Sequence, residues 1–358
     1  MRRTGASRLG GLLAILATPL VAAPVKRDEN ILFVPTVARD AQDGRVRVPI
    51  EAWVHEHEPR RGAMRLFARW LDLDLGALEA EERERFSART QLFRVDSERG
   101  KAVRVRFADG SEQTLPRTRD GGRSRAEMDV PAQVVGSHGR IDFEAVLPPE
   151  DTRHIIGHAW HVPATGLSVG SDIDDTIKHS HVGDRRELLL NTFLRAFDAA
   201  PGMAARYREL AAAPGTRFHY VSSSPLQLLP ALEAFLADAG FPAGSLHLRE
   251  TTSLLRLWRS ESRAHKHAAI VALLRDFPQR RFVLVGDSGG ADPEIYADLA
   301  RAHPRQVVAI AIRDVSGEGL DAARWRSVFA DLDAGLWQVF TDADGWRQDD
   351  LARATTQR

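Results

Sequence analysis

The residues best suited to chemistry lie in segment 170–176. Asp172, Asp174 and Thr176 alternate through it, directly after an apolar stretch (167–169) that has the pattern of a buried strand end. Residues two apart in a strand project to one side, so these polar side chains are predicted to share a face. Ligands bind at the carboxyl ends of strands in open α/β sheets, and carboxylates crowded there need a compensating charge, commonly a divalent cation. The segment therefore predicts a metal-assisted site, provided that partner residues follow downstream.

A second predicted strand, residues 218–221, ends in polar residues. Ser222 and Ser223 follow it, with Ser224 and a helical pattern immediately after. Hydroxyls and backbone N–H groups at such a strand-to-helix turn suit a phosphate. The alternative is that these serines only cap the helix.

A third predicted strand, residues 281–286, ends in carboxylates. Asp287 follows it, and Asp292 comes after a pair of glycines that permit close backbone approach. The carboxyl ends of parallel strands meet at one edge of a sheet, so both aspartates are predicted to lie near the first pair.

Lysine is rare in this chain. Of 49 basic residues only four are lysines, and these are Lys26, Lys101, Lys178 and Lys266. A compact ammonium suits a small space beside a phosphate and a carboxylate better than a planar guanidinium does. Lys266, at the start of a predicted helix, is therefore expected to act in the site. For Lys178 a substrate-binding role and an ordinary structural role both stay open.

Taken in order, these motifs resemble those of the haloacid dehalogenase superfamily of aspartyl-phosphate phosphatases. The sequence motifs at 171–178, 191–194, 218–222, 240–242, 286–289 and 292–296 look more specifically like the catalytic domain of actin-patch phosphatidate phosphatases, with lipins as more distant relatives. The resemblance covers roughly residues 165–315. It implies an enzyme that removes the phosphate from phosphatidate in the presence of Mg²⁺.

The resemblance also implies residue roles. Asp172 is expected to be the nucleophile, and Asp174 the general acid for the leaving alcohol and then the base for water. Thr176 is expected to fix the motif loop. The residues expected to hold the phosphoryl group are Ser222, Ser223, Lys266 and Lys178.

A magnesium ion is the implied cofactor. Its expected ligands are Asp172, the backbone carbonyl of Asp174, and Asp287, with Asp292 orienting the metal shell. Asp175 is expected to point away from the site and to have a structural role.

The whole chain is long enough for two domains. Its 358 residues carry 49 acidic and 49 basic side chains, so no net charge favours nucleic acid, and it has no cysteine for disulfides. Residues 1–23 have a basic start and a short apolar run typical of a signal peptide, with an uncleaved anchor as the alternative. We therefore predict an exported protein, periplasmic or extracellular, with no transmembrane span after signal removal.

Two regions follow the predicted signal peptide. Residues 24–165 are predicted to form a β-rich domain, a sandwich, with strands at 46–54, 103–107, 126–130 and 141–147, a helical insertion at 63–86 and a loop at 117–125. Residues 166–358 are predicted to form an α/β domain like that of the haloacid dehalogenases. Its doubly wound parallel sheet has predicted strands at 167–169, 218–221, 246–248, 282–285 and 307–312.

The partner is expected to be a phospholipid substrate at a membrane surface. Segment 251–259 interleaves Leu and Trp with Arg, so it is a candidate for peripheral membrane contact, although it can equally close the core. Two alternative functions stay open: a phosphatase of small soluble phosphomonoesters, and a non-catalytic module that binds phosphate or lipid.

Overall fold

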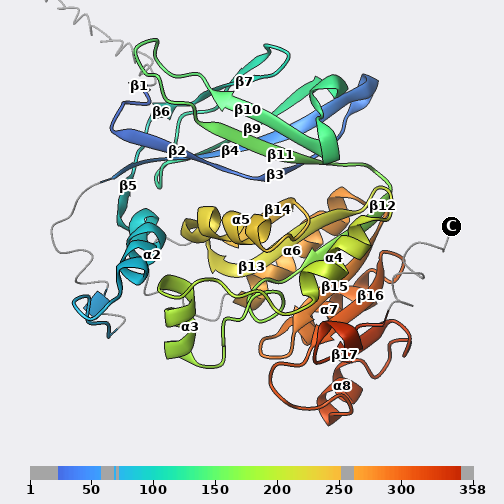
Figure 1. Cartoon of the computed structure of the whole chain (residues 1–358). Helices are drawn as coiled ribbons and strands as arrows, with labels where there is room; N and C mark the ends of the chain where they lie inside the picture. The colour runs from blue at the N-terminus through green and yellow to red at the C-terminus, as the bar shows by residue number, and fades with distance from the viewer. Residues whose placement is uncertain (1–22, 58–67, 70–71, 251–261, 348–358) are drawn as a thin grey trace, which may run out of the picture.

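The chain forms two large β-sheets, one above the other, with helices around the second (Figure 1). A computed structural model describes residues 23–57, 68–69, 72–250 and 262–347. The predicted signal peptide, apart from Ala23, and segment 251–259 lie outside these residues. Among the residues that the structure describes, no helix has the length and apolar character needed to cross a bilayer.

The second sheet has six strands, all parallel, and confirms the α/β prediction. Its strands in spatial order are β14 (Gly244–Arg249), β13 (Arg217–Pro225), β12 (Gly166–Ser171), β15 (Arg280–Asp287), β16 (Val307–Arg313) and β17 (Trp337–Phe340). Chain order reverses between β12 and β15, because β13 and β14 lie on one side of β12 while β15 to β17 lie on the other. Such a switch point leaves a crevice at the carboxyl ends of the two central strands.

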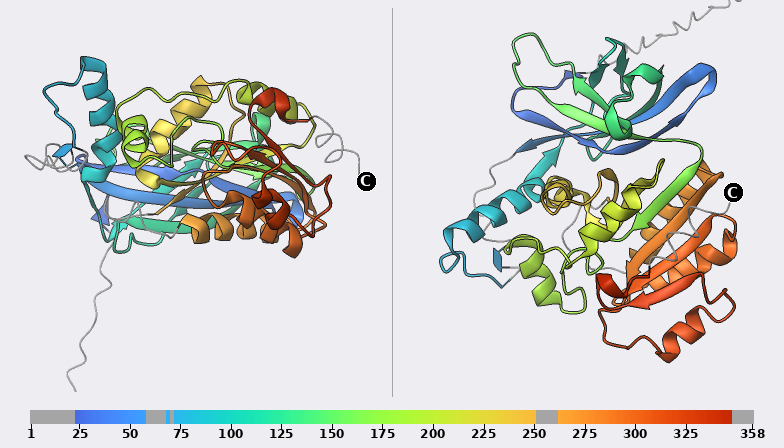
Figure 2. Two further views of the ribbon diagram at one scale, coloured as in Figure 1. Left: turned by 90° about the horizontal axis from the view of Figure 1, so that it is seen from below. Right: turned by 45° about the vertical axis from the view of Figure 1, so that its right-hand side comes forward.

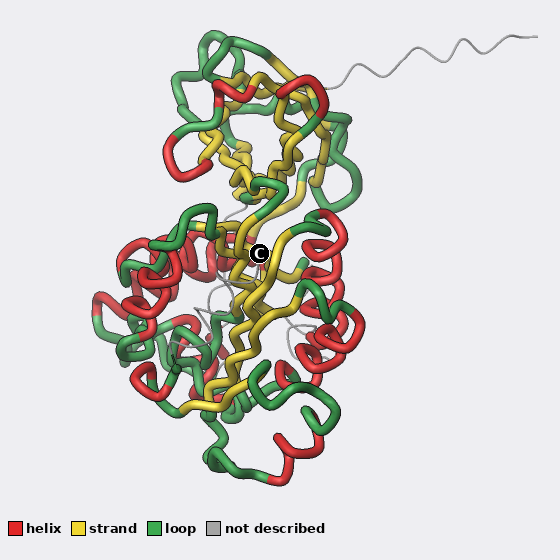
Figure 3. The backbone as a smooth tube through the Cα atoms, turned by 90° about the vertical axis from the view of Figure 1, so that its right-hand side faces the viewer, coloured by secondary structure: helices red, strands yellow, loops and turns green. Residues whose placement is uncertain are grey.

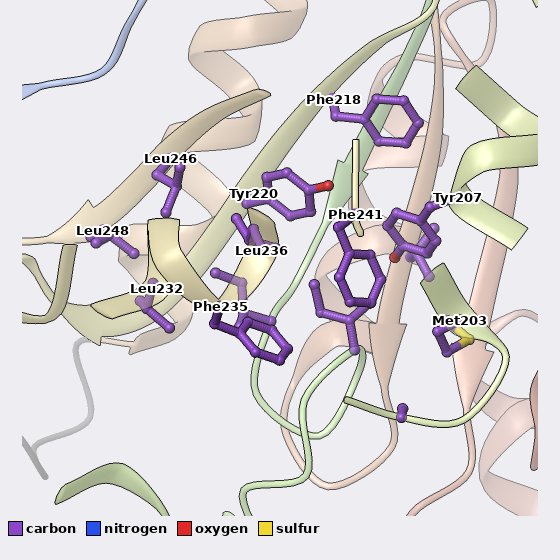
Figure 4. Packing of buried hydrophobic residues seen from close by; sticks show 14 of the residues in the cluster. Met203, Tyr207, Phe218, Tyr220, Leu232, Phe235, Leu236, Phe241, Leu246 and Leu248 are labelled. Carbon is purple, nitrogen blue, oxygen red and sulfur yellow. The ribbon is translucent and has the colours of Figure 1, made fainter. Parts of the chain in front are cut away.

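Helices cover both faces of this sheet (Figure 3). On one face lie α3 (Arg185–Phe193), α4 (Met203–Ala211) and α5 (Leu229–Asp238). On the other face lie α6 (Ser262–Asp276), α7 (Asp292–Ala302) and α8 (Ala323–Val328). Figure 4 shows the core under α4 and α5, where the ring of Tyr207 stacks on Phe218 at 5.8 Å and meets Phe241 edge-on at 5.4 Å. Burial of such rings fixes the sheet that carries the site.

The first sheet has nine strands and is mainly antiparallel. Its strands are β2 (Glu29–Val34), β3 (Thr36–Asp40), β4 (Arg45–His57), β5 (Val95–Ser97), β7 (Arg104–Phe107), β8 (Glu112–Thr114), β9 (Arg123–Pro131), β10 (Arg140–Ala145) and β11 (Ile156–Val162). A separate parallel pair joins β1 (Ala23–Pro24) to β6 (Lys101–Ala102).

One continuous sheet thus stands where a sandwich of two sheets was predicted. The long strand β4 makes this possible because it changes partner along its length. Val46 and Arg47 pair with β3, residues 51–56 pair with β2, and β9 follows the opposite edge. The inward-facing side chains of these strands gather in a single core.

The bounds of two further elements in this region differ from the prediction. The helical insertion is present, but residues 72–79 within the predicted range 63–86 form turns, and helix α2 spans Ala80–Thr90. Residues 63–67 and 70–71 lie outside the described part of the chain. A positive φ at Asp72 interrupts any earlier helix, and Glu79 begins α2 through a reciprocal capping box with Glu82. The predicted loop 117–125 also ends early, because β9 starts at Arg123 to pair with β4.

The two sheets share side-chain packing. Trp53 of β4 and Phe86 of α2 belong to the same buried cluster as the residues beneath α3, α4 and α5. Arg280, at the start of β15, is fully buried and donates hydrogen bonds to the carbonyls of Pro163 (2.9 Å) and Thr165 (2.5 Å) in the connection between the sheets. The β-rich region is therefore fastened to the sheet that carries the predicted catalytic residues.

Candidate active site

The predicted site residues meet at the switch point of the parallel sheet. Asp172 follows β12 directly, and its backbone N–H donates to the carbonyl of Val285 at 2.9 Å, which continues the pairing with β15. Asp287 is the last residue of β15. Gly286 precedes it, where an added Cβ would lie 2.5 Å from a carboxylate oxygen of Asp292. Only glycine leaves room for this approach.

Three buried carboxylates form one cluster. Asp172, Asp287 and Asp292 each offer an oxygen within 4.8 Å of the others. The Lys266 Nζ lies 3.0 Å from Asp172 Oδ1 and 2.7 Å from Asp292 Oδ1. Among the described residues, this is the single ammonium in contact with the cluster, so three carboxylates share one positive charge.

Burial and mutual repulsion change the acidity of these groups. Burial raises the pKa of Asp172 well above its ordinary value, and Asp292 and Asp287 add to the increase while Lys266 opposes it. Burial, with repulsion from Asp292, raises the pKa of Asp287 to about 7. Burial alone would lower the pKa of Lys266, but the nearby carboxylates outweigh it and raise that pKa, so Lys266 stays charged.

Asp174 has a separate set of partners. Its Oδ1 lies 2.8 Å from Lys178 Nζ and accepts from Ser180 Oγ at 2.6 Å. Its Oδ2 accepts from Ser224 Oγ at 2.8 Å and from Ser222 Oγ at 3.2 Å. Burial would raise the pKa of Asp174, but Lys178 and these hydroxyl donors outweigh it, so the pKa lies well below its ordinary value. The two aspartates of one motif thus have opposite electrostatic surroundings.

Lys178 lies against Asp174. Its side chain is 2% exposed, Nζ also donates to Ser180 Oγ, and it lies 4.8 Å from the ring centroid of Phe197. The main interaction of an ammonium so enclosed is with the carboxylate it contacts, that of Asp174.

The remaining motif residues shape the loop. Thr176 donates to Asp172 Oδ2 at 3.3 Å. Asp175, at a φ of 57°, accepts from the backbone N–H groups of Ser180, His181 and Val182 at 2.6 to 2.8 Å. Its carboxylate therefore closes the loop after the motif, which is a structural use.

The serines do not cap the following helix. Strand β13 runs on through Pro225, and neither η5 (Leu226–Leu228) nor α5 has a side-chain N-cap bond. The hydroxyls of Ser222 and Ser224 instead donate hydrogen bonds to Asp174, and Ser223 between them is half-buried. Sequence reasoning missed Ser180 and Ser224 as partners of Asp174. Their closeness to Lys178 and Ser222 in the chain was the available signal.

The donor set fits a hard divalent cation. All three cluster carboxylates supply oxygen, the ligand type that Mg²⁺ takes in proteins. If all three are ionised, Lys266 neutralises one charge and leaves two, which equals the charge of one such ion. Repulsion among these carboxylates adds to the effect of burial in raising the pKa values of Asp172 and Asp287.

Comparison with known proteins finds likeness in this part of the chain. The family model described as phosphatidate phosphatase APP1, catalytic domain, matches residues 167–314. The Saccharomyces cerevisiae protein named phosphatidate phosphatase APP1 is 36% identical over 167 residues, which cover 46% of this chain and 28% of the yeast protein. An uncharacterized protein of Schizosaccharomyces pombe is 32% identical over 190 residues, 51% of this chain and 31% of that protein.

The chain thus spans about a third or less of the length of these curated relatives. The matched residues run from the second residue of β12 through β16 and include every aspartate, serine and lysine of the site described above. Residues 167–314, which carry the whole candidate site, are therefore similar to the catalytic domain of phosphatidate phosphatase APP1.

Proposed function

We propose that the chain is a Mg²⁺-dependent phosphatidate phosphatase that releases phosphate through an aspartyl-phosphate on Asp172. The observation that carries the proposal is the environment of that carboxylate: it is buried at the switch point, 3.0 Å from Lys266, and clustered with Asp287 and Asp292. The family match supplies the substrate class, because the yeast relative is named for phosphatidate.

In the first step an Asp172 oxygen attacks phosphorus and the bond to the lipid oxygen breaks. Asp174 gives its proton to that leaving oxygen, so diacylglycerol departs as a neutral alcohol. The phosphate dianion of the bound substrate lies beside Asp174 and raises the pKa of that carboxyl by repulsion. Asp174 therefore carries the proton that it donates. Lys266 and the Ser222 hydroxyl hold the phosphoryl oxygens.

In the second step water attacks phosphorus and Asp174 takes its proton. The bond from phosphorus to the Asp172 oxygen breaks, which returns the carboxylate and releases inorganic phosphate. The Lys178 ammonium, 2.8 Å from Asp174, stabilises the ionised Asp174 carboxylate before it accepts this proton. The residues that would hold Mg²⁺ are Asp172, Asp287 and Asp292, with the backbone carbonyl of Asp174, and the bound ion would offset the charge of carboxylate and phosphate meeting.

Export stays part of the proposal and depends on residues 1–23, whose composition is that of a signal peptide. An exported enzyme would meet its lipid at a membrane surface. The predicted contact segment, 251–259, lies outside the described residues.

The test is phosphate release from phosphatidate, lysophosphatidate and p-nitrophenyl phosphate, each with Mg²⁺ and with a chelator. Asp172→Asn is the matched control, because it keeps the shape of the side chain and removes the nucleophile. We expect Mg²⁺-dependent release with preference for the lipid, and none from Asp172→Asn. Preference for the soluble ester would favour the alternative substrate class. Retention of more than about a tenth of the activity by Asp172→Asn would exclude the aspartyl-phosphate, since uncatalysed ester hydrolysis is extremely slow.

A further inference from the structure

Helix α2, from the β-rich region, closes the end of α3 in the region that carries the site. The two helices lie side by side in Figures 1 and 2. Arg85 Nε donates to the Leu194 carbonyl at 2.7 Å, and Arg89 Nη1 donates to the carbonyls of Arg195 (2.7 Å) and Thr192 (3.0 Å). Thr192 lies in the last turn of α3, whose carbonyls have no partner within the helix, while Leu194 and Arg195 lie at and after its end. Arginines from a distant part of the chain thus bind both the last turn of α3 and the turn after it.

Arg89 also packs on the aromatic ring of Phe197, and that ring contacts Lys178 of the site. Its guanidinium carbon is 3.6 Å from the ring centroid of Phe197, and Lys178 Nζ is 4.8 Å from that centroid. Phe235 of α5 meets the ring edge-on at 5.8 Å. Burial lowers the pKa of Arg89 to about 10, so the guanidinium stays charged at neutral pH and the cation–π contact is retained.

The backbone beyond Phe197 is paired with the backbone of Lys178. Lys178 and Ala199 form an antiparallel bridge. The N–H of His179 donates to the Asp198 carbonyl at 2.8 Å, and the N–H of Ala200 donates to the Ile177 carbonyl at 2.9 Å. A displacement of residues 194–199 would therefore move Lys178, which lies 2.8 Å from Asp174.

We propose that Arg89 is a positioning residue for the phosphatase reaction. It holds Phe197 and the turn after α3, and these hold the Lys178 ammonium on the carboxylate of Asp174. The inference rests on the proposed function, in which Asp174 transfers the proton. It gives α2, which precedes the residues matched by the family model, a part in the chemistry of the site.

The test compares two substrates whose leaving groups differ in their need for a general acid. p-Nitrophenolate departs without a proton, whereas the alcohol of the lipid must be protonated. Wild type, Arg89→Met and Phe197→Leu are compared on dioctanoyl phosphatidate and on p-nitrophenyl phosphate. The matched control is Arg94→Met, because Arg94 is also half-buried but donates to the carbonyls of Thr90 and Ser87. We expect kcat/KM on the lipid to fall by about tenfold or more in both test variants, a fraction of what general acid catalysis supplies. This ratio covers only the steps up to release of the alcohol, and so it leaves out the second step, in which Asp174 takes a proton from water with either ester. The kcat/KM for p-nitrophenyl phosphate, and both ratios for the control, should change less than about twofold.

A double variant, Arg89→Met with Phe197→Leu, should lose no more than the worse single variant, because both act through one ring. Equal losses on both substrates with a lower melting temperature would make Arg89 a purely structural tie and overturn the inference. Unchanged lipid turnover in Arg89→Met would overturn it as well, while the proposed function would stand. A wild-type protein that releases no phosphate from either ester would instead refute the proposed function, and the inference with it.

Discussion

Lys266 places a compact charge in a narrow space between two carboxylates, 3.0 Å from Asp172 and 2.7 Å from Asp292. We predict that Lys266→Arg lowers kcat by about 10²-fold, because the wider guanidinium cannot take this position and one donor to the transition state is lost. Steady-state turnover is the measurement. Lys26→Arg is the control, since that side chain is 61% exposed. Near-normal turnover of Lys266→Arg would mean that any cation suffices there.

A variant of Asp287 should show metal binding through thermal stability, without an activity assay. We predict that Mg²⁺ raises the melting temperature of the wild-type protein and leaves that of Asp287→Asn nearly unchanged. An ion at 100 times its Kd stabilises the folded state by about 2.7 kcal/mol. Without the ion the variant should be the more stable of the two, because it removes one of three crowded carboxylates. Asp276→Asn, on an exposed residue of α6, is the control. An equal effect of Mg²⁺ on all three proteins would place its binding elsewhere.

At the scale of elements, α5 presents a carboxyl to β11. Glu233 Oε1 lies 3.5 Å from His158 Nε2, and burial raises the pKa of Glu233 to about 7 although Arg140 opposes the shift. The folded protein therefore binds this proton more tightly than the unfolded chain does. The stability that results is fully present below the ordinary value of 4.5 and is lost as pH rises through about 7.

Glu233→Gln should accordingly melt at the same temperature as wild type at pH 4 and a few degrees higher at pH 8. Burial lowers the pKa of His158 to about 4, so this residue destabilises the protein as pH falls. At pH 8 His158 is neutral and at pH 4 Glu233 is protonated, so no ion pair between them affects the comparison at either pH. Thermal melts across this range are the measurement, and a difference that does not change with pH would contradict the assignment.

The elements around the site were largely predictable because buried parallel strands are apolar runs. Residues 282–285 and 307–312 have that pattern and form β15 and β16. The helix predicted at 63–86 overlaps α2 only at 80–86, because helical spacing of apolar residues followed by a charged run does not show where a helix begins. The structure places that start at Glu79. Strand β17 was missed because its four residues, Trp337–Phe340, include a polar Gln338 that is nonetheless buried.

At the site, the order of the motifs identified residues but not their pairing. Asp172 and Asp174 look equivalent in the sequence, yet one lies among carboxylates and the other among hydroxyls and an ammonium. That division depends on Lys178 together with Ser180 and Ser224, which reach Asp174 from the loop after the motif and from the end of β13, a meeting that no local pattern encodes. The contact of α2 with α3 joins residues about a hundred positions apart, beyond the range of sequence periodicity.

For the whole molecule, Arg280 should decide how firmly the two sheets are joined. Besides Pro163 and Thr165, its guanidinium donates to the carbonyls of Leu167 and Gly215 and to Ser168 Oγ. We predict that Arg280→Met costs on the order of 3 kcal/mol of unfolding free energy, because several carbonyls lose their donor.

Urea denaturation would measure this loss, with Arg275→Met on the exposed side of α6 as the control. A midpoint within experimental error of wild type would show that water replaces the guanidinium at no cost. This experiment measures stability and does not test the predicted domain boundary at residue 165.

The shared core beneath α2 has a consequence for synthesis on the ribosome. Phe86 is fully buried, and α2 packs on α3 and on η5, which ends at Leu228. Translation must therefore add 228 − 90 = 138 residues after α2 before that surface is complete. At ordinary elongation rates this takes roughly 7 to 30 s. During that interval the nascent β-rich region carries an uncovered aromatic face, so this stage is where a chaperone would bind and where a pause in translation would favour aggregation.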